Sequence, residues 1–214
     1  MKKKTLWFML INVNKNEVKM KNLDKNSKTK ENLLKAFAGE SMARNRYTFY
    51  SKIAKKEGFE QIAGFFLETA ENEKEHAKIF YGFLGEQADT MEIKDAKYGI
   101  GISNSTLTNL QNAASGEHEE NSFLYPSFSK IAKEEGYDEI SSAFSNVVKV
   151  EIEHEKRYLE LINNILDGKV FKKEEEVIWK CRKCGYHHIG KKAPDICPVC
   201  KHPIGYFELF VKNY

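Results

Sequence analysis

Apolar residues recur in alternating steps of three and four through most of residues 28–166. In the last part of this region the stripe consists of Ile140, Phe144, Val147, Glu151, His154, Tyr158, Leu161 and Ile165. Such steps place side chains on one face of an α-helix, so the pattern predicts packed helices rather than strands.

An internal repeat divides the helical region into two halves. SKIAKKEG at residues 51–58 returns as SKIAKEEG at residues 129–136. Each copy ends in a glycine followed by an aromatic residue, and glycine commonly ends a helix in the left-handed conformation. The repeat therefore predicts two helix pairs, at residues 28–57, 60–86, 104–135 and 138–166, with a long crossover at 87–103.

Five glutamates and two histidines lie on helix stripes where packing calls for apolar side chains. They are Glu40, Glu73, His76, Glu117, Glu120, Glu151 and His154. A buried carboxylate without compensation costs several kcal/mol, and too few Lys or Arg residues share these stripes. Glu and His three residues apart share a helix face, so they reach a common ion. The stripes therefore predict two iron or manganese ions in the bundle; a polar network or a misassigned stripe register is the alternative.

Two tyrosines lie on or beside the same stripes. The phenols of Tyr47 and Tyr125 could donate hydrogen bonds to ligand carboxylates, although core filling is nearly as good an explanation. The third helix also holds one residue more than the first between its glycine and the repeat. A π-bulge near Tyr125-Pro126 would accommodate it, with a simple proline kink as the alternative.

All four cysteines stand in two pairs near the C-terminal end of the sequence. Cys181 and Cys184 form the first pair, and Cys197 and Cys200 form the second. Four thiolates at this spacing build a tetrahedral site for iron or zinc, and the spacing does not choose between them. A structural zinc ribbon is the commoner answer for an isolated module, whereas a redox-capable bundle in the same chain favours iron.

Composition and charge narrow the function. The 214 residues are 41% hydrophobic and 30% charged, which excludes a disordered chain, and the net charge of +3 does not favour nucleic acid or an anionic membrane. The longest apolar run, residues 6–11, is too short for a membrane span or a secretory signal, so we expect a cytoplasmic protein. We expect a poorly ordered extension at 1–27, a bundle at 28–166, a charged linker at 167–176 and a second domain at 177–214.

Several segments resemble the rubrerythrin family. They are AFAGESMARNRY from Ala36, ENEKEHAK from Glu71, GEHEENSFLYP from Gly116, EIEHEKRYL from Glu151, and the tail motifs WKCRKCGYHHIG and CPVCKHP. The resemblance covers about residues 20–214. It implies a mainly α fold, a ferritin-like antiparallel four-helix bundle with a long crossover, followed by a small rubredoxin-like C-terminal domain.

The resemblance also implies an activity. It is that of a non-haem di-iron peroxidase, active in oxidative stress defence, which reduces hydrogen peroxide to water. Electrons would come from an NAD(P)H-dependent reductase, from rubredoxin or from both, and pass through iron in the four-cysteine site. A head-to-tail homodimer is suggested as well.

The family's ligand roles transfer to this sequence by position. They imply that Glu73 and Glu151 bridge the irons, with Glu40 terminal on one and Glu117 and His154 on the other. Glu120 and His76 would exchange as ligands of the first iron, Glu120 in the ferric and His76 in the ferrous state. The catalytic candidates are therefore Glu120, His76, Tyr47 and Tyr125.

Three other functions are compatible with parts of this pattern. A ferritin-like ferroxidase with a structural zinc ribbon needs the bundle ligands but no electron-delivering tail. A non-catalytic binding protein whose zinc ribbon docks a partner would have no need for five inward-facing glutamates. A manganese catalase needs no external electrons, and manganese or zinc could also replace iron in the bundle.

Overall fold

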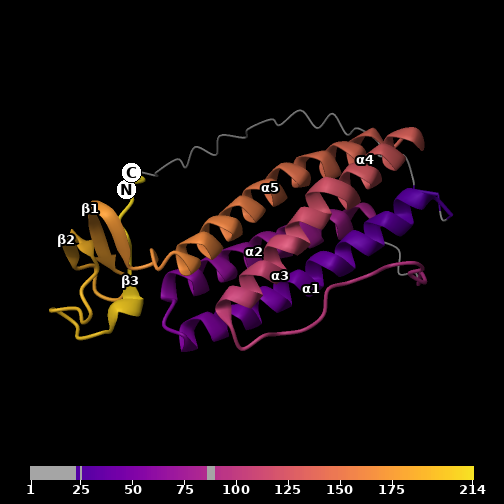
Figure 1. The fold of residues 1–214 in the computed structure, drawn as a ribbon. Helices are drawn as coiled ribbons and strands as arrows, with labels where there is room; N and C mark the ends of the chain where they lie inside the picture. Colours follow the sequence, from indigo (N-terminus) through magenta and orange to yellow (C-terminus); the bar gives the residue numbers. More distant parts are fainter. Residues whose placement is uncertain (1–22, 25, 86–89) are drawn as a thin grey trace, which may run out of the picture.

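The computed structural model describes residues 23, 24, 26–85 and 90–214. Long helices run side by side in a bundle, and a small sheet lies at one end of it (Figure 1). The first helix pair is α1 (Lys28–Lys56) and α2 (Glu60–Phe83). The second pair consists of α3 (Thr106–Glu119), continued by the π-helical turn η1 (Glu120–Leu124) and α4 (Tyr125–Glu134), and of α5 (Asp138–Leu166). The expected bundle of two helix pairs is confirmed.

Glycine ends the first helix of each pair, as the repeat predicts. Gly58 and Gly136 have φ values of 81° and 79°, which is the left-handed conformation. The next residue in each turn donates its backbone N–H to a carbonyl in the last helical turn, Phe59 to Ala54 and Tyr137 to Ala132. These bonds satisfy carbonyls that the helix end would otherwise leave without a partner.

The extra residue of the third helix is accommodated by the π-helical turn η1. The backbone N–H of Tyr125 reaches back to the carbonyl of Glu120, a five-residue step. Beyond η1 the buried face moves by one position. The stripe through Glu117 and Glu120, continued in steps of three and four, predicts Leu124 and Ile131 on the inward face, but Tyr125 and Ala132 are buried instead. The predicted π-bulge is confirmed, and the inward stripe after it is corrected by one residue.

The crossover between the two helix pairs runs along the outside of α1 (Figure 1). Three hydrogen bonds attach it there: the hydroxyl of Tyr98 donates to the carbonyl of Lys35, Arg46 to that of Gly99, and Tyr50 to that of Gly101. The crossover is therefore held close to the middle of α1, where Glu40 lies.

The C-terminal domain is a three-stranded antiparallel sheet in the order β2-β1-β3. Its strands are β1 (Lys172–Cys181), β2 (His187–Lys192) and β3 (Phe207–Leu209), with a 3-10 turn η2 (Ile204–Tyr206) before β3. Trp179 is fully buried at the centre, and its indole N–H donates to the carbonyl of Gly190 at 2.9 Å. A small aromatic core therefore holds the sheet together.

The charged segment before this domain is shorter than the sequence suggests. The expected linker covers residues 167–176, but β1 already begins at Lys172, which pairs with Lys192. Strand pairing uses backbone groups, so the charged side chains of residues 172–176 can stay near solvent. A segment of this composition resembles a linker in the sequence even though it forms a strand. Residues 172–176 therefore belong to the sheet.

The small domain packs against the Gly58 end of the bundle. A Cβ added at Gly205 would lie 2.3 Å from the carbonyl oxygen of Gly58, so the two backbones are in direct contact. The rings of Phe59 and Phe171 stack with centroids 6.1 Å apart. These contacts give the domain a defined position on its own bundle.

Part of the expected N-terminal extension is folded against the bundle. Leu23 packs against the core, and the backbone N–H of Asp24 donates to the hydroxyl of Tyr137 at 3.0 Å. The side chain of Ser27 accepts a bond from the backbone of Lys30 and begins α1. Residues 1–22 and 25 lie outside the described part of the chain.

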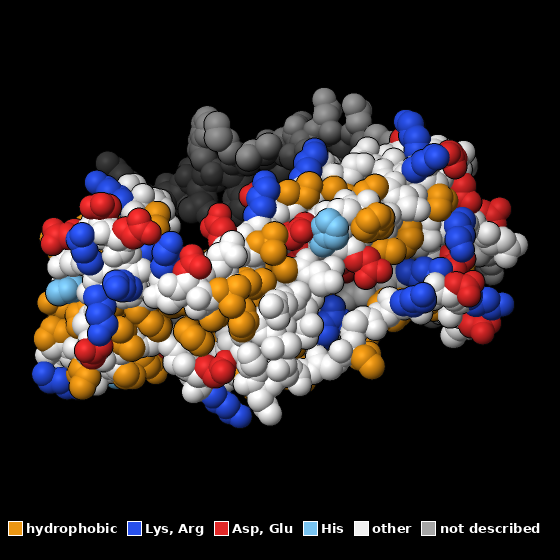
Figure 2. Space-filling view, in the orientation of Figure 1, with side chains coloured by type: hydrophobic (Ala, Val, Ile, Leu, Met, Phe, Trp, Pro, Cys, Tyr) orange, Lys and Arg blue, Asp and Glu red, His pale blue; other side chains and the backbone are white. Residues whose placement is uncertain are grey.

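The surface carries charges of both signs. On the face that Figure 2 shows, acidic and basic side chains are mixed. Within the described ranges, none of the helices is both long enough and apolar enough to span a membrane.

Candidate metal centres

Six of the seven predicted bundle ligands come together in the middle of the helices. They form two groups whose possible ligand atoms all lie within 4.8 Å of one another: Glu40, Glu73, His76 and Glu151 in the first, and Glu73, Glu117, Glu151 and His154 in the second. We call them the Glu40 group and the Glu117 group. Glu73 and Glu151 belong to both, so the two groups share a pair of carboxylates.

Each histidine faces both shared glutamates. Nδ1 of His76 lies 2.9 Å from Oε2 of Glu73 and 2.9 Å from Oε1 of Glu151. Nδ1 of His154 lies 3.3 Å from Oε1 of Glu73 and 2.8 Å from Oε2 of Glu151. Each carboxylate therefore presents a different oxygen to each histidine, which is the arrangement of a ligand that spans two adjacent ions.

The four glutamates of these groups are almost completely buried without basic side chains beside them. Their exposed fractions are 0–1%, and within the described residues their only ion-pair partners are His76 and His154. Within the two groups, six buried atoms lack a hydrogen bond of acceptable geometry: Glu40 Oε2, Glu73 Oε1 and Oε2, His76 Nδ1, Glu117 Oε2 and Glu151 Oε1. Buried charge without partners costs several kcal/mol, so these residues fit a pair of cations. Carboxylate and imidazole donors suit iron or manganese.

In the metal-free protein, the protonated side chains of the two histidines supply the positive charge that the metal ions would supply. Burial by itself would lower the pKa of His76, but the close carboxylates of Glu151 and Glu73 outweigh burial and raise it to about 9. Neighbouring carboxylates overcome burial at His154 in the same way and raise its pKa to about 12. Burial would raise the pKa of Glu151, but the hydrogen bond from His154 and the nearby ring of His76 lower it to about 2. Metal binding must therefore displace protons from both imidazoles.

Two phenols and one amide orient the ligands. Tyr125 donates to Oε1 of Glu40 at 2.5 Å, and Tyr47 donates to Oε1 of Glu117. Both contacts agree with the sequence-based prediction for these tyrosines. Nε2 of His154 lies 3.2 Å from Oδ1 of Asn72, a contact that fixes the imidazole ring. Asn72 was not predicted, because nothing in the sequence distinguishes it from a solvent-facing asparagine on the same helix.

Glu120 is the predicted ligand that neither group includes. Its carboxylate lies over Gly39, where an added Cβ would be 3.9 Å from Oε1 of Glu120 and 3.8 Å from the ring of Tyr98. Glu120 begins η1 and lines a pocket between α1, α3 and the crossover. His76 lies in the Glu40 group, and Glu120 faces the pocket beside it. Outside both groups also lie His118, His187, His188 and His202.

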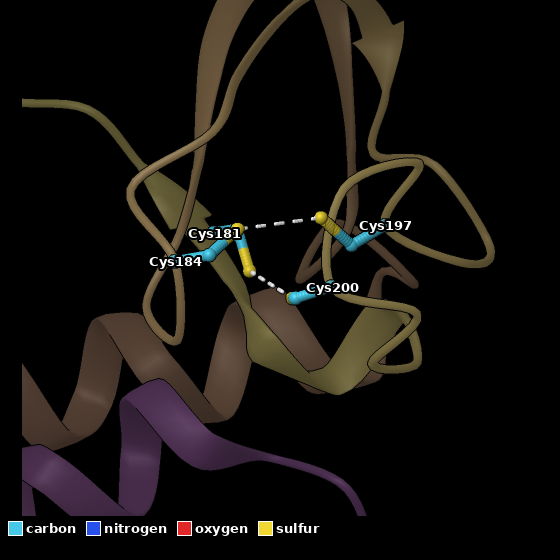
Figure 3. Close-up of side chains that lie close together, drawn as sticks. All are labelled: Cys181, Cys184, Cys197 and Cys200. Atoms are coloured by element: carbon cyan, nitrogen blue, oxygen red, sulfur yellow. Dashed lines mark hydrogen bonds between the residues drawn. The ribbon is translucent and has the colours of Figure 1, made fainter.

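The four cysteines converge at one end of the small sheet (Figure 3). The Sγ atoms of Cys181 and Cys200 lie 3.7 Å apart, and those of Cys184 and Cys197 lie 3.6 Å apart. Four sulfurs bound at ~2.3 Å around one tetrahedral ion would be about 3.8 Å from each other, so the spacing fits iron or zinc. All four cysteines are free of disulfide bonds.

Two matching turns hold the cysteine pairs. Gly185 and Lys201, which follow the second cysteine of each pair, have φ values of 78° and 62°. Each donates its backbone N–H to the carbonyl of the pair's first cysteine, at 2.9 Å for Gly185 and 3.0 Å for Lys201. The two Cys-x-x-Cys segments therefore share one loop geometry, as expected for a preformed four-sulfur site.

Comparisons with known proteins agree with both sites. The family model described as Rubrerythrin matches residues 31–162, and the one described as Rubrerythrin, rubredoxin-like domain, matches residues 179–208. Rubrerythrin of Porphyromonas gingivalis is 53% identical over 200 residues, which cover 94% of this chain and 98% of the relative.

Solved structures resemble the chain as well. The fully reduced, all-ferrous state of nigerythrin is 31% identical, with a TM-score of 0.56 and coverage of 98% of this chain and 100% of that chain. Mycobacterium tuberculosis bacterioferritin is 18% identical, with a TM-score of 0.55 over 69% of this chain and 90% of that chain, and it shows the ferritin-like fold alone. With its ferritin-like bundle, its carboxylate–histidine di-iron site and its rubredoxin-like four-cysteine site, the chain belongs to the rubrerythrin family.

Proposed function

We propose that this protein is a non-haem di-iron peroxidase that reduces hydrogen peroxide to water in cytoplasmic oxidative stress defence. The observation that supports this most directly is the pair of overlapping ligand groups that share Glu73 and Glu151 next to an open pocket. These residues would hold two ferrous ions, which would supply the two electrons that reductive cleavage of a peroxide O–O bond requires. The family match and the four-cysteine site in the same chain also support this proposal.

The residues of the bundle hold and orient this site. Glu73 and Glu151 offer one oxygen to each metal position, and Glu40 and Glu117 close the two ends. The hydroxyls of Tyr125 and Tyr47 fix one oxygen of each end carboxylate, so that the other oxygen stays directed at the metal position.

Glu120 and His76 are proposed to alternate as ligands in the Glu40 group. With Nδ1 of His76 beside Glu73 and Glu151, the carboxylate of Glu120 remains over Gly39 and the pocket side of the group stays open to peroxide. An anionic oxygen suits the more highly charged ferric state, whereas four carboxylates already neutralise two ferrous ions and leave room for a neutral imidazole. Exchange of these two side chains would therefore follow the oxidation state.

Electrons are proposed to reach the bundle through iron in the four-cysteine site, from an NAD(P)H-dependent reductase, from rubredoxin or from both. The small domain lies at the Gly58 end, with Arg182 against Gly64 of α2. His76 is twelve residues further along this helix, or roughly 18 Å at ~1.5 Å per residue. A head-to-tail homodimer would bring a partner's four-cysteine site nearer, which is why we propose this assembly.

Metal analysis and visible spectroscopy on anaerobically purified protein test the proposal. Near three irons per chain, with a colourless reduced state that peroxide rapidly converts to a thiolate-to-ferric spectrum, would support it. One zinc with about two irons and no four-cysteine spectrum would remove the electron relay and favour a ferritin-like ferroxidase instead. Retained metal without any oxidation by peroxide would contradict the peroxidase directly.

A further inference from the structure

The pocket beside Glu120 is larger than hydrogen peroxide requires. It has a volume of about 410 Å³ and lies between α1, α3 with η1, and the crossover. A water molecule occupies ~30 Å³ in the liquid, so hydrogen peroxide, with two oxygens, needs roughly twice that volume. Pockets of ~300–1,000 Å³ are typical of sites for organic ligands.

The pocket reaches the di-iron site through two of its wall residues. Glu120 lines it, and so does Tyr125, whose hydroxyl donates to Oε1 of Glu40 at 2.5 Å. A molecule that fills the pocket therefore has one end beside the Glu40 group. The crossover covers the pocket and is fixed by the bond from Arg46 to the carbonyl of Gly99 at 3.2 Å.

The charges around the pocket do not favour an anionic ligand. The basic side chains in its wall are Lys35, Arg46 and Lys97, and the acidic ones are Asp95, Glu119 and Glu120. Lys35 is already paired with Glu31 at 2.7 Å. With Lys35 engaged by Glu31, the wall offers no excess of positive charge to an anion, so a neutral ligand fits it better.

Apolar and aromatic side chains also line the pocket. They include Ala36, Tyr50, Tyr98, Leu124, Tyr125 and Phe128. The rings of Tyr125 and Phe128 lie in contact, with centroids 6.1 Å apart. A hydrocarbon or aromatic group can bury apolar surface against these side chains, whereas hydrogen peroxide has no apolar surface to bury.

We propose that the pocket binds neutral organic hydroperoxides and that the protein reduces them to alcohols. This inference rests on the proposed peroxidase function, which supplies the reductant. The O–O bond of ROOH breaks, two electrons from the reduced di-iron site and two protons are consumed, and one ROH and one H₂O are formed. The organic group occupies the pocket, while the peroxide oxygens face the Glu40 group.

Single-turnover kinetics with cumene hydroperoxide test the activity. The reduced, full-length protein is mixed with either cumene hydroperoxide or hydrogen peroxide. The rate of oxidation of the protein and the yield of 2-phenyl-2-propanol are measured. We expect one alcohol per two electrons and a rate constant within about tenfold of that for hydrogen peroxide. Oxidation by hydrogen peroxide with no alcohol from cumene hydroperoxide would overturn this inference and leave the proposed function intact.

Filling the pocket provides the matched variants. Ser115→Trp places a large ring into the pocket from α3, and Ser115 is exposed, so that the fold tolerates it. Gln111→Trp, exposed on the same helix but outside the pocket wall, is the control. We expect Ser115→Trp to lower the ratio of the cumene hydroperoxide rate constant to the hydrogen peroxide rate constant by about tenfold or more. Equal effects on both substrates, or the same loss in Gln111→Trp, would overturn the assignment.

Ligand-observed NMR provides a readout that needs no turnover. The zinc-loaded, full-length protein is titrated with 2-phenyl-2-propanol, and saturation transfer to the alcohol is followed. Binding that Ser115→Trp abolishes and Gln111→Trp preserves supports the pocket even if hydrogen peroxide proves not to be a substrate. Absence of binding, or binding that survives Ser115→Trp, overturns it.

Discussion

The hydroxyl of Tyr125 donates a 2.5 Å hydrogen bond to Oε1 of Glu40, although 85 residues separate the two in sequence. Tyr47 makes the corresponding bond to Glu117, across 70 residues. Each tyrosine thus serves one ligand group and comes from the helix pair opposite its glutamate. The two phenols tie the helix pairs together at the ends of the metal site.

Replacing either tyrosine with phenylalanine should weaken one metal position selectively. We expect Tyr125→Phe to lower the metal affinity of the Glu40 group, and Tyr47→Phe to lower that of the Glu117 group. Each loss should be about 10–100-fold, because a ligand carboxylate loses the hydrogen-bond donor that orients it. A stepwise ferrous titration of the metal-free protein, followed by optical or calorimetric signals, separates the two positions. If both variants lose the same binding step, the assignment of one tyrosine to each group is wrong.

Metal-free protein should lose stability as pH rises. The pKa of His76 is about 9 in the fold against an ordinary value of 6.5, so its stabilisation is complete below pH 6.5 and is lost through pH 9. Glu40 and Glu117 act in the same direction, because burial and then the charge of Glu73 raise their pKa values above 4.5.

We therefore expect the free energy of unfolding of the metal-free protein to fall by roughly 3 kcal/mol from His76 across this window. Urea unfolding at several pH values measures the change, and the iron-loaded protein, whose ligands are already deprotonated, is the control. A free energy of unfolding that stays level or increases from pH 6.5 to 9 would show that His76 is not held as a cation in the metal-free fold.

Glu73 and Glu120 should give different phenotypes. Glu73 belongs to both ligand groups, so Glu73→Ala is expected to lose both bundle irons and all peroxide turnover. Glu120 lies outside both groups, so Glu120→Ala should keep near-normal ferrous binding but slow peroxide turnover by about 100-fold or more, because ligand exchange then fails. Metal content and stopped-flow oxidation test the pair. Unchanged turnover in Glu120→Ala would exclude the exchange while leaving the di-iron site in place.

The helices and most of the bundle ligands could be predicted because each leaves a local mark on the sequence. Glu73, His76, Glu151 and His154 interrupt an apolar stripe at a fixed spacing, and burial on that stripe demands a cation. The π-helical turn was visible because one extra residue breaks an otherwise regular repeat. The helical periodicity of the sequence therefore predicts both the bundle fold and the ligand residues on the inward faces of its helices.

Other features depend on contacts that no local pattern records. The position of Glu120 is set by η1 and by the space over Gly39, and the contact of Asn72 with His154 requires packing between α2 and α5. The start of β1 at Lys172 depends on pairing with Lys192, which hydrophobicity does not show. The pocket is formed by the crossover, whose position follows from hydrogen bonds between segments that are far apart in sequence.

The contact between Gly205 and Gly58 should fix the small domain on the bundle. A methyl group at Gly205 would meet backbone atoms of Gly58 at 2.3–3.1 Å, and backbone has little freedom to move away. We expect Gly205→Ala to separate or distort this interface at a cost of about 1–3 kcal/mol, as for overpacking elsewhere. Faster hydrogen–deuterium exchange in η2 and in the first turn of α2 would report the loss.

Gly82→Ala is the matched control for this change. Gly82 lies within α2, and a Cβ there meets nothing within 4 Å, so alanine should leave the interface intact and stabilise the helix by about 0.5–1 kcal/mol. If Gly205→Ala leaves exchange in η2 and α2 unchanged, the domain is not held at Gly58 in solution. In that case the four-cysteine site is free to reach other positions on the bundle, and the distance argument for a homodimer no longer holds.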